Sequence, residues 1–275
     1  MTGVQTCALP ISKKERLDLV LVQQGLFTSR QAAQKRIMAG EVLVNDQKID
    51  KAGTQVPTDA SIRLLGKDLP YVSRGGLKLE EAVKTFQLDL TGGAVCDLGA
   101  STGGFVDCAL QHGARKVYAI DVGTNQLVWQ LRTHPQVDCR EQTNARYLTA
   151  ADFPEQMDWV TTDVSFISLT KIFPAAADIL KSDGQMVALI KPQFEAGREH
   201  VGKHGVVRDL DVHQAVIAKV VAAAEDEGLY PRGLTPSPIR GPAGNVEYLL
   251  WLSKDAHLAV APDIPAVVAA GAAIP

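Results

Sequence analysis

The sequence predicts an α/β protein: a doubly wound, largely parallel sheet preceded by a small α+β domain. Three observations predict this class. From residue 94 onward, short apolar runs typical of buried strands alternate with helical patterns. A glycine-rich turn, residues 99–104, directly follows the first of these runs. The preceding part of the chain carries two short helical patterns and two short apolar runs instead.

The composition is that of an ordinary globular chain, with 46% hydrophobic and 21% charged residues among 275. No apolar stretch approaches the roughly 18 residues needed to cross a bilayer. The four cysteines form no C-x-x-C pair, which indicates a reducing cytoplasm. Residues 13–67 hold ten Lys and Arg against six Asp and Glu, in a chain whose net charge is −3. This basic segment predicts a polyanion partner.

The order of domains follows from breaks in these patterns. Residues 1–12 lack the basic start of a signal peptide and are interpreted as an extraneous leader. The small domain is expected over residues 13–67, a linker over 68–71, the large domain over 72–254 and a loosely packed tail over 255–275.

Capping residues and periodicity place the elements of both domains. Thr28-Ser29 is a candidate N-cap, and Gly25 and Gly40 are candidate helix stops. Helices are expected over residues 16–24, 30–39, 105–112 and 211–227. Strands are expected over residues 42–44, 62–65, 94–98, 117–120, 186–190 and 248–252, with another leading from around Val160 into Asp163.

The glycine turn predicts where a cofactor binds, because ligands of doubly wound sheets lie beyond the carboxyl ends of the strands. Position 101 is Ser, so the G-x-G-x-x-G fingerprint of dinucleotide sites fails at its middle glycine. Asp121 ends the next strand, where it suits the two hydroxyls of an adenosine ribose. S-adenosylmethionine has this ribose and no pyrophosphate, so we predict it as the cofactor. Its predicted ligands are Asp97, Gly99, Ser101, Gly103, Gly104, Phe105, Asp121, Val122, Asn144 and Asp163.

Two other chemistries are less favoured. Residues 99–103 also match G-x-S-x-G, the nucleophile elbow of α/β hydrolases, but no late His stands in a suitable loop and no oxyanion motif is visible. His200 and His204 have a metal-like spacing, yet the stretch is broken by glycine and lacks a third ligand. No metal is therefore expected.

The basic segment resembles the small RNA-binding domain first seen in ribosomal protein S-four. The resemblance is carried by R-L-D (16–18), G-L-x-x-S-R (25–30), A-x-x-x-I-x-x-G-x-V-x-V-N (33–45) and Lys51. It implies binding of structured RNA through Arg and Lys contacts to phosphate. The residues predicted to bind RNA are Arg16, Arg30, Lys35, Arg36 and Lys48, with Arg74 from the large domain.

The large domain resembles the FtsJ-type ribose methyltransferases, and the whole chain from about Lys13 to Lys254 resembles the TlyA family. The motifs are S-R-G-G-L-K-L (73–79), D-L-G-A-S-T-G-G-F (97–105), Y-A-I-D-V-G (118–123), T-D-V-S-F-I-S-L (162–169), I-K-P-Q-F-E (190–195) and G-N-V-E-Y-L (244–249). The resemblance implies a Rossmann-like methyltransferase sheet and 2′-O-methylation of ribosomal RNA, usually at cytidine. It places the catalytic tetrad at Lys78, Asp163, Lys191 and Glu247.

Elementary chemistry gives these four residues roles. A ribose hydroxyl must lose its proton as it attacks a sulfonium methyl group, and a neutral lysine can accept that proton. We expect Lys191 to act as this base or to steer the hydroxyl, and Asp163 to orient Lys191. Lys78 and Glu247 would complete a network of ion pairs among the four side chains. The expected partner is a ribosomal subunit, and the chain is expected to be a cytoplasmic monomer.

Two function classes remain as alternatives. The TlyA family carries an old hemolysin label, which implies a membrane-lytic protein, although no spanning segment or secretion signal is visible. An RNA-binding assembly factor without catalysis is the other, and the complete tetrad argues against it.

Overall fold

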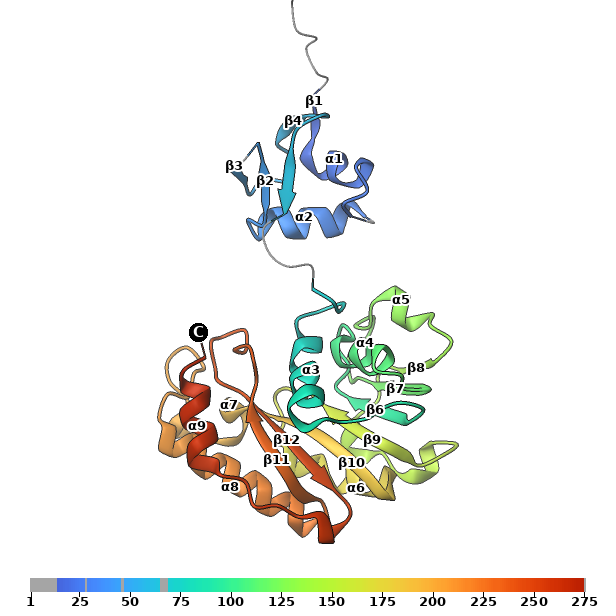
Figure 1. Ribbon diagram of the computed structural model, residues 1–275, viewed down its shortest axis with the longest axis vertical. Coiled ribbons are helices and arrows are strands. Elements are labelled where there is room, and N and C mark those ends of the chain that lie inside the picture. Colours follow the sequence, from blue (N-terminus) through green and yellow to red (C-terminus); the bar gives the residue numbers. More distant parts are fainter. Residues whose placement is uncertain (1–13, 28, 46, 65–68, 275) are drawn as a thin grey trace, which may run out of the picture. The chain divides into compact units, whose positions relative to one another are not determined.

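The computed structural model describes residues 14–27, 29–45, 47–64 and 69–274. The chain divides into two compact units, residues 1–68 and 69–275 (Figure 1). The expected leader, Thr28, Asp46 and residues 65–68 lie outside the described residues. Among the described residues, no helix is long and apolar enough to cross a membrane.

The N-terminal unit is a pair of helices packed on short antiparallel strands. Its elements are β1 (Lys14–Arg16), α1 (Leu17–Gln23), α2 (Arg30–Met38), β2 (Val42–Val44), β3 (Gln47–Ile49), β4 (Gln55–Pro57) and β5 (Ile62–Leu64). Strand β2 lies between β3 and β5, and β1 pairs with β4. Ser29 caps α2, since its hydroxyl accepts a hydrogen bond from the Ala32 amide. Leu17, Leu21 and Ile37 form the centre of its small core.

A buried carboxylate joins the two helices of this unit. Asp18 is 0% exposed, and its oxygens accept hydrogen bonds from Arg16 at 3.0 Å, Arg30 at 3.1 Å and Gln34 at 2.6 Å. Two of the predicted RNA contacts, Arg16 and Arg30, thus have a structural role, while about half of each side chain stays exposed.

We expect Asp18 to make the stability of the N-terminal unit sensitive to acid. The hydrogen bond from Arg16, with those from Gln34 and Arg30, holds the pKa of Asp18 well below its usual value. A depressed folded-state pKa stabilises the fold above pH 4, and this contribution is lost as the pH falls further. Asp18→Asn should cost about 1.5–3 kcal/mol at pH 7 and clearly less at pH 3. Urea unfolding followed by hydrogen exchange in α1 and α2 measures both values; equal costs at both pH values would refute the expectation.

The large unit is a seven-stranded sheet with helices on both faces, which confirms the predicted fold class. Its strands are β6 (Ala94–Leu98), β7 (Lys116–Ile120), β8 (Val137–Arg140), β9 (Met157–Thr162), β10 (Leu180–Ile190), β11 (Tyr230–Pro236) and β12 (Tyr248–Ser253). They lie in the order β11-β12-β10-β9-β6-β7-β8. Strands β6 to β10 are parallel, whereas β12 is antiparallel to β10 and β11 is antiparallel to β12.

The helices cover the two faces of this sheet because alternate strand residues point to opposite sides. Val95 packs with residues of α3 (Gly75–Phe86) and α4 (Gly104–Gln111), whereas Cys96 packs with residues of α6 (Phe173–Ile179) and α8 (Leu210–Asp226). Figure 1 shows these two pairs on opposite sides of the strands. The unit also contains α5 (Trp129–Arg132), α7 (Pro192–Glu195) and α9 (Ile264–Ala272).

The tail differs from the expectation of loose packing. It forms α9, in which Val268 is 1% exposed, and Asp263 caps the helix by accepting from the Ala266 amide. Its alanine-rich sequence gives a weak periodic signal, since small residues pack closely without forming a long apolar stripe. Strands β8 and β11 and helix α3 are further elements that sequence patterns did not predict.

Candidate active site

The order of the strands reverses at β6, so the carboxyl ends of several parallel strands lie together at one end of the sheet. Strand β6 has β9 on one side and β7 on the other, so a crevice opens beyond their carboxyl ends. Leu98 pairs with Thr162 in register, and Ile190 pairs with Tyr248. The residues that follow β6, β9 and β10 therefore lie beside the residue that precedes antiparallel β12. This register brings Asp163, Lys191 and Glu247 together.

Lys78 reaches the same end of the sheet from α3, whose first residues lie very close to Gly104, the first residue of α4. A Cβ atom at Gly104 would lie 2.5 Å from the Ser73 hydroxyl oxygen. It would also lie 2.7 Å from the Gly76 nitrogen and 3.0 Å from the Gly75 Cα. Only glycine permits so close an approach of backbones. The first turn of α3 is thereby fixed against the glycine turn, and Lys78 lies in that turn, 7% exposed.

The four predicted catalytic residues form one continuous network of ion pairs. Lys78 Nζ lies 2.7 Å from Glu247 Oε2 and 3.6 Å from Asp163 Oδ2. Lys191 Nζ lies 2.5 Å from Asp163 Oδ1. Both lysines and Glu247 are buried, and Asp163 is partly exposed. Two positive and two negative groups balance one another, which lowers the cost of burying them.

Lys191 has additional partners that its sequence motif did not indicate. Its ammonium group donates to the Ser165 hydroxyl at 2.9 Å and to the Asp163 carbonyl at 3.3 Å. Ser165 lies two residues after Asp163, so the same turn supplies all these acceptors. The direction in which Lys191 points is therefore set by the turn that follows β9.

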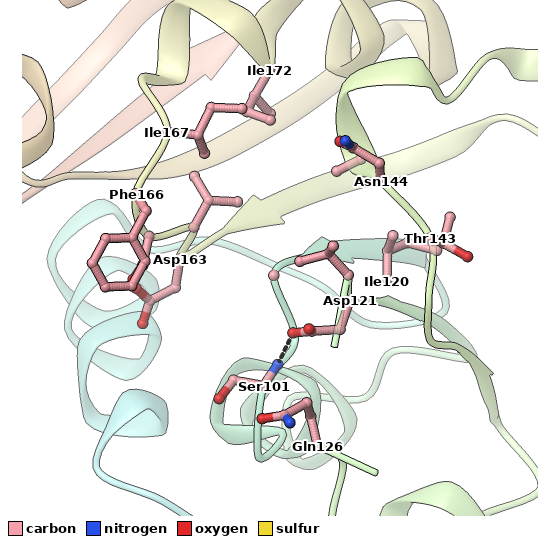
Figure 2. Close-up of a pocket in the computed structure, with 15 residues that line it drawn as sticks. Ser101, Ile120, Asp121, Gln126, Thr143, Asn144, Asp163, Phe166, Ile167 and Ile172 are labelled. Carbon is pink, nitrogen blue, oxygen red and sulfur yellow. Dashed lines mark hydrogen bonds between the residues drawn. The ribbon is translucent and has the colours of Figure 1, made fainter. Parts of the chain in front are cut away.

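A pocket of about 420 Å³ lies beside this network. Its size falls in the range of small-molecule sites. Asp163, Phe166 and Asn144 lie around it, and the Asp121 carboxylate accepts a hydrogen bond from the Ser101 amide (Figure 2). The lining residues are Gly99, Ser101, Ile120, Asp121, Val122, Gln126, Thr143, Asn144, Ala145, Asp163, Val164, Ser165, Phe166, Ile167 and Ile172.

Six of the ten predicted cofactor ligands line this pocket, and four do not. Asp97, Gly103, Gly104 and Phe105 are absent from the lining among the described residues. Phe105 is 3% exposed and packs in the core on one face of the sheet, since the helix that begins at Gly104 turns its side chain inward. Gly104 instead serves the contact with α3. Gln126, Thr143 and Ser165 line the pocket but were not predicted from the sequence.

Asp121 occupies the position expected for a ribose-binding carboxylate. Its Oδ2 accepts from the Ser101 amide and its Oδ1 from the Gly123 amide, each at 2.7 Å. A carboxylate oxygen accepts more than one hydrogen bond, so both retain capacity for ligand hydroxyls. Val122 beside it is 74% exposed, which leaves an apolar surface at the mouth of the pocket.

Asp97 provides a test of whether a cationic cofactor suits the site. Its side chain is 1% exposed; Oδ1 accepts from the Thr161 hydroxyl, and Oδ2 has no partner among the described residues. Burial, with a smaller contribution from the nearby Asp163 and Asp121 carboxylates, raises the pKa of Asp97 to about 7. A positively charged ligand would relieve this accumulation of carboxylates. S-adenosylmethionine carries a sulfonium and an ammonium group, so the residues present fit it.

One group of possible metal ligands lies outside this pocket. Ligand atoms of Glu80, Cys108 and His112 lie within 4.8 Å of one another. Hydrogen bonds from Lys84, Tyr71 and His112 outweigh burial and lower the pKa of Glu80 to about 2, so both of its oxygens already hold donors. Burial raises the pKa of the Cys108 thiol to about 12, which keeps it protonated. The group therefore connects α3 to α4 by hydrogen bonds.

The remaining predicted RNA contacts have different surroundings. Lys35 and Lys48 are exposed in the N-terminal unit, while Arg36 forms an ion pair of 2.6 Å with Glu41. In the large unit, exposed Arg74 donates to the Arg240 carbonyl at 3.0 Å.

Comparison with known proteins gives consistent matches over both units. A model described as "FtsJ-like methyltransferase" matches residues 71–254, and one described as "S4 domain" matches residues 15–62. The "Putative rRNA methyltransferase YqxC" of Bacillus subtilis is 50% identical over 242 residues, which cover 88% of this chain and 86% of that protein. The "16S/23S rRNA (cytidine-2'-O)-methyltransferase TlyA" of Mycobacterium tuberculosis is 40% identical over 243 residues, which cover 88% and 91%.

Solved structures agree with these relatives. A structure titled "Putative hemolysin from Streptococcus thermophilus" has a TM-score of 0.74 and 47% sequence identity. The match covers 94% of this chain and 95% of that chain.

Proposed function

The chain belongs to the FtsJ-like methyltransferase family, and from this membership we propose that it transfers a methyl group from S-adenosylmethionine to a ribose 2′-hydroxyl of ribosomal RNA, at cytidine. The observation that carries the proposal is the buried network of Lys78, Asp163, Lys191 and Glu247 beside the pocket. The relatives' names give the substrate, and the match to an S4 domain supports an RNA partner.

The cofactor would be held by the pocket that Asp121, Asn144 and Ser101 line, with Asp163 supplying negative charge and the buried Asp97 behind the glycine turn. When bound, S-adenosylmethionine supplies an electrophilic methyl group on a sulfonium. The protein must then bring a hydroxyl into line with that group and remove its proton. Asp163 both lines the pocket and binds the two lysines, so it connects the cofactor site to the network.

Lys191 is the residue best placed to act on the hydroxyl. Asp163 and Ser165 fix its direction, and an amine freed of its proton accepts one from the 2′-oxygen as the new carbon–oxygen bond forms. Lys78 pairs with Asp163 from the other side and is itself held by Glu247, so both contribute positioning. The step balances: the neutral lysine amine gains the proton and the 2′-oxygen gains the methyl, while the methyl–sulfur bond breaks and its electron pair stays on the departing thioether sulfur.

The RNA would be engaged by the exposed basic residues Lys35 and Lys48, by the exposed halves of Arg16 and Arg30, and by Arg74. Phosphate contacts of this kind orient a protein on RNA without specifying a sequence. A monomeric, cytoplasmic enzyme acting on ribosomal subunits is the corresponding proposal for its partners and location.

The proposal is tested with purified protein, S-adenosylmethionine and ribosomal subunits that lack ribose methylation. Mapping of 2′-O-methyl groups should find a newly modified cytidine in ribosomal RNA. The absence of any ribose-methylated nucleotide, with the protein folded and the cofactor bound, would overturn it. A liposome leakage assay run in parallel examines the hemolysin name of the structural relative, and leakage without methylation would favour that alternative.

We expect Asp121→Ala to weaken cofactor binding about tenfold or more, because hydrogen bonds to a charged acceptor are worth about 1.5–3 kcal/mol. The variant also frees the amides of Ser101 and Gly123, which shape the pocket. Calorimetric titration with S-adenosylmethionine measures the change. Asp138→Ala is the control, since Asp138 lies on the next strand, β8, outside the pocket lining, and forms an ion pair with Arg140. Equal affinity of Asp121→Ala and wild type would contradict the assigned role.

A further inference from the structure

Glu247 is enclosed by the loop that leads to it, residues 237–247, here called the Glu247 loop. The Ser237 amide donates to the Glu247 carbonyl at 2.8 Å, and the Gly241 amide donates to the Asn245 carbonyl at 2.9 Å. A Cβ atom at Gly241 would lie 2.5 Å from Glu247 Oε1. The backbone of the loop is thus packed directly on the carboxylate that binds Lys78, so a shift of the loop moves that carboxylate.

Arg240 connects this loop to the end of α9. Its Nε and Nη2 donate to the Ile274 carbonyl at 3.0 and 2.6 Å, and Nη2 also lies 3.4 Å from the Ala272 carbonyl. Its Nη1 donates to the Gly244 carbonyl at 3.2 Å, within the Glu247 loop. Carbonyls at the end of a helix lack partners in the helix, and a cation there is favoured by the helix dipole.

The same residue also touches α3. The Arg240 carbonyl accepts the hydrogen bond from Arg74, the residue before the first turn of α3, and that turn carries Lys78. Arg240 therefore has contacts on both sides of the Lys78–Glu247 ion pair: its carbonyl accepts from the Arg74 side chain at the start of α3, and its guanidinium donates to the Gly244 carbonyl in the Glu247 loop.

Helix α9 is fitted closely to the strands that flank the Glu247 loop. A Cβ atom at Gly271 would lie 2.9 Å from Val246 Cγ1, 3.1 Å from Tyr248 Cε1 and 3.3 Å from Pro236 Cβ. Val246 and Tyr248 are the immediate neighbours of Glu247. The position of α9 is consequently transmitted to Glu247 by packing as well as by the Arg240 hydrogen bonds.

We propose that Arg240 is a positioning residue for Glu247, and that α9, which lies beyond the residues matched by the methyltransferase family, supports the active site through it. This inference rests on the proposed function for its catalytic readout. A direct contact of Arg240 with RNA phosphate is the competing role. Its guanidinium nitrogens already donate to three backbone carbonyls, which favours positioning.

The consequence for catalysis follows from geometry. A misplacement of about 1 Å in a reacting assembly costs on the order of 100-fold in rate. The Glu247 loop does not contribute to the pocket lining among the described residues. Loss of Arg240 should therefore lower kcat at least tenfold while the cofactor Kd stays within about twofold of wild type.

The test compares the full-length variants Arg240→Met and Gly271→Ala with wild type. Methionine retains an aliphatic chain without the donors, and alanine at position 271 favours the helix while colliding with Val246. Both should lower kcat without raising KM for the ribosomal subunit, and both should speed amide exchange in residues 241–247. The control is Ala270→Gly, which weakens the helix on its exposed face and should leave kcat unchanged.

Three outcomes overturn the proposal. These are wild-type kcat and loop protection in Arg240→Met, a raised KM with unchanged kcat, and exchange that speeds up equally throughout the large unit. The second would indicate an RNA contact and the third a general loss of stability. If the wild type itself methylates no ribosomal RNA, the proposed function fails, while hydrogen exchange in the Glu247 loop and calorimetric titration with the cofactor still decide whether Arg240 holds that loop.

Discussion

Replacement of Lys191 by alanine should reduce methyl transfer by about 10²–10⁴-fold, the usual contribution of general acid–base catalysis. Cofactor binding should be retained, because Lys191 does not line the pocket among the described residues. Single-turnover methylation of ribosomal subunits and calorimetric titration with S-adenosylmethionine measure the two properties separately. Lys191→Arg distinguishes a general base from a group that only steers the hydroxyl, since a guanidinium can donate to the hydroxyl oxygen but does not accept its proton.

The matched control for Lys191 lies at the other end of the same strand. Lys181 follows the first residue of β10 and pairs with Asp158 at 2.5 Å, far along the strand from the carboxyl-end crevice. Lys181→Ala should retain wild-type transfer and lose at most about 1 kcal/mol of stability. Transfer by Lys191→Ala at the wild-type rate would remove Lys191 from the mechanism.

Replacement of Glu247 by alanine should destabilise the large unit by about 3 kcal/mol and abolish activity. The change leaves the buried Lys78 ammonium without its partner at 2.7 Å, and Asp163 at 3.6 Å compensates only in part. Breaking a buried ion pair from one side costs about 3–5 kcal/mol, because an uncompensated charge remains. Urea unfolding of the full chain, followed in the large unit, measures the loss.

A double replacement distinguishes an unpaired charge from lost packing. Lys78→Met combined with Glu247→Leu removes both charges, so it should be less destabilising than the sum of the single variants while remaining inactive. Glu155→Ala is the surface control: its pair with Arg115 is partly exposed, and its loss should cost about 1 kcal/mol or less. Additive costs for Lys78 and Glu247 would show that their ion pair contributes no coupling energy.

The central strands were predictable because they are almost entirely apolar and are followed by residues typical of strand ends, such as Gly99 and Asp121. Strand β6 occupies the predicted residues 94–98, and β7 differs by one residue from the prediction. The last strand was located well, but its antiparallel direction was not predictable from a short apolar run. That direction places Glu247 beside Lys191, so the sequence could supply the four residues only through the family resemblance.

The site residues that sequence reasoning missed act through backbone geometry. Ser165 binds Lys191 because of the turn after β9, and Arg240 acts through carbonyl groups that every residue possesses. Phe105 was predicted as a cofactor ligand from its place after the glycine turn, yet the helical phase directs it into the core. Local patterns do not encode such long-range contacts, whereas α9 was missed because its alanine-rich sequence gives only a weak periodic signal.

The backbone contact between Gly104 and the Gly75–Gly76 pair has a thermodynamic consequence. It joins the turn that borders the proposed cofactor pocket to the helix that carries Lys78, through close approach of the two backbones and of the short Ser73 side chain. A ligand that shifts one of these segments should shift the other, so under the proposed function we expect cofactor binding and RNA binding to share a free energy of coupling. Linkage is reciprocal: whatever factor the cofactor adds to RNA affinity, RNA adds to cofactor affinity.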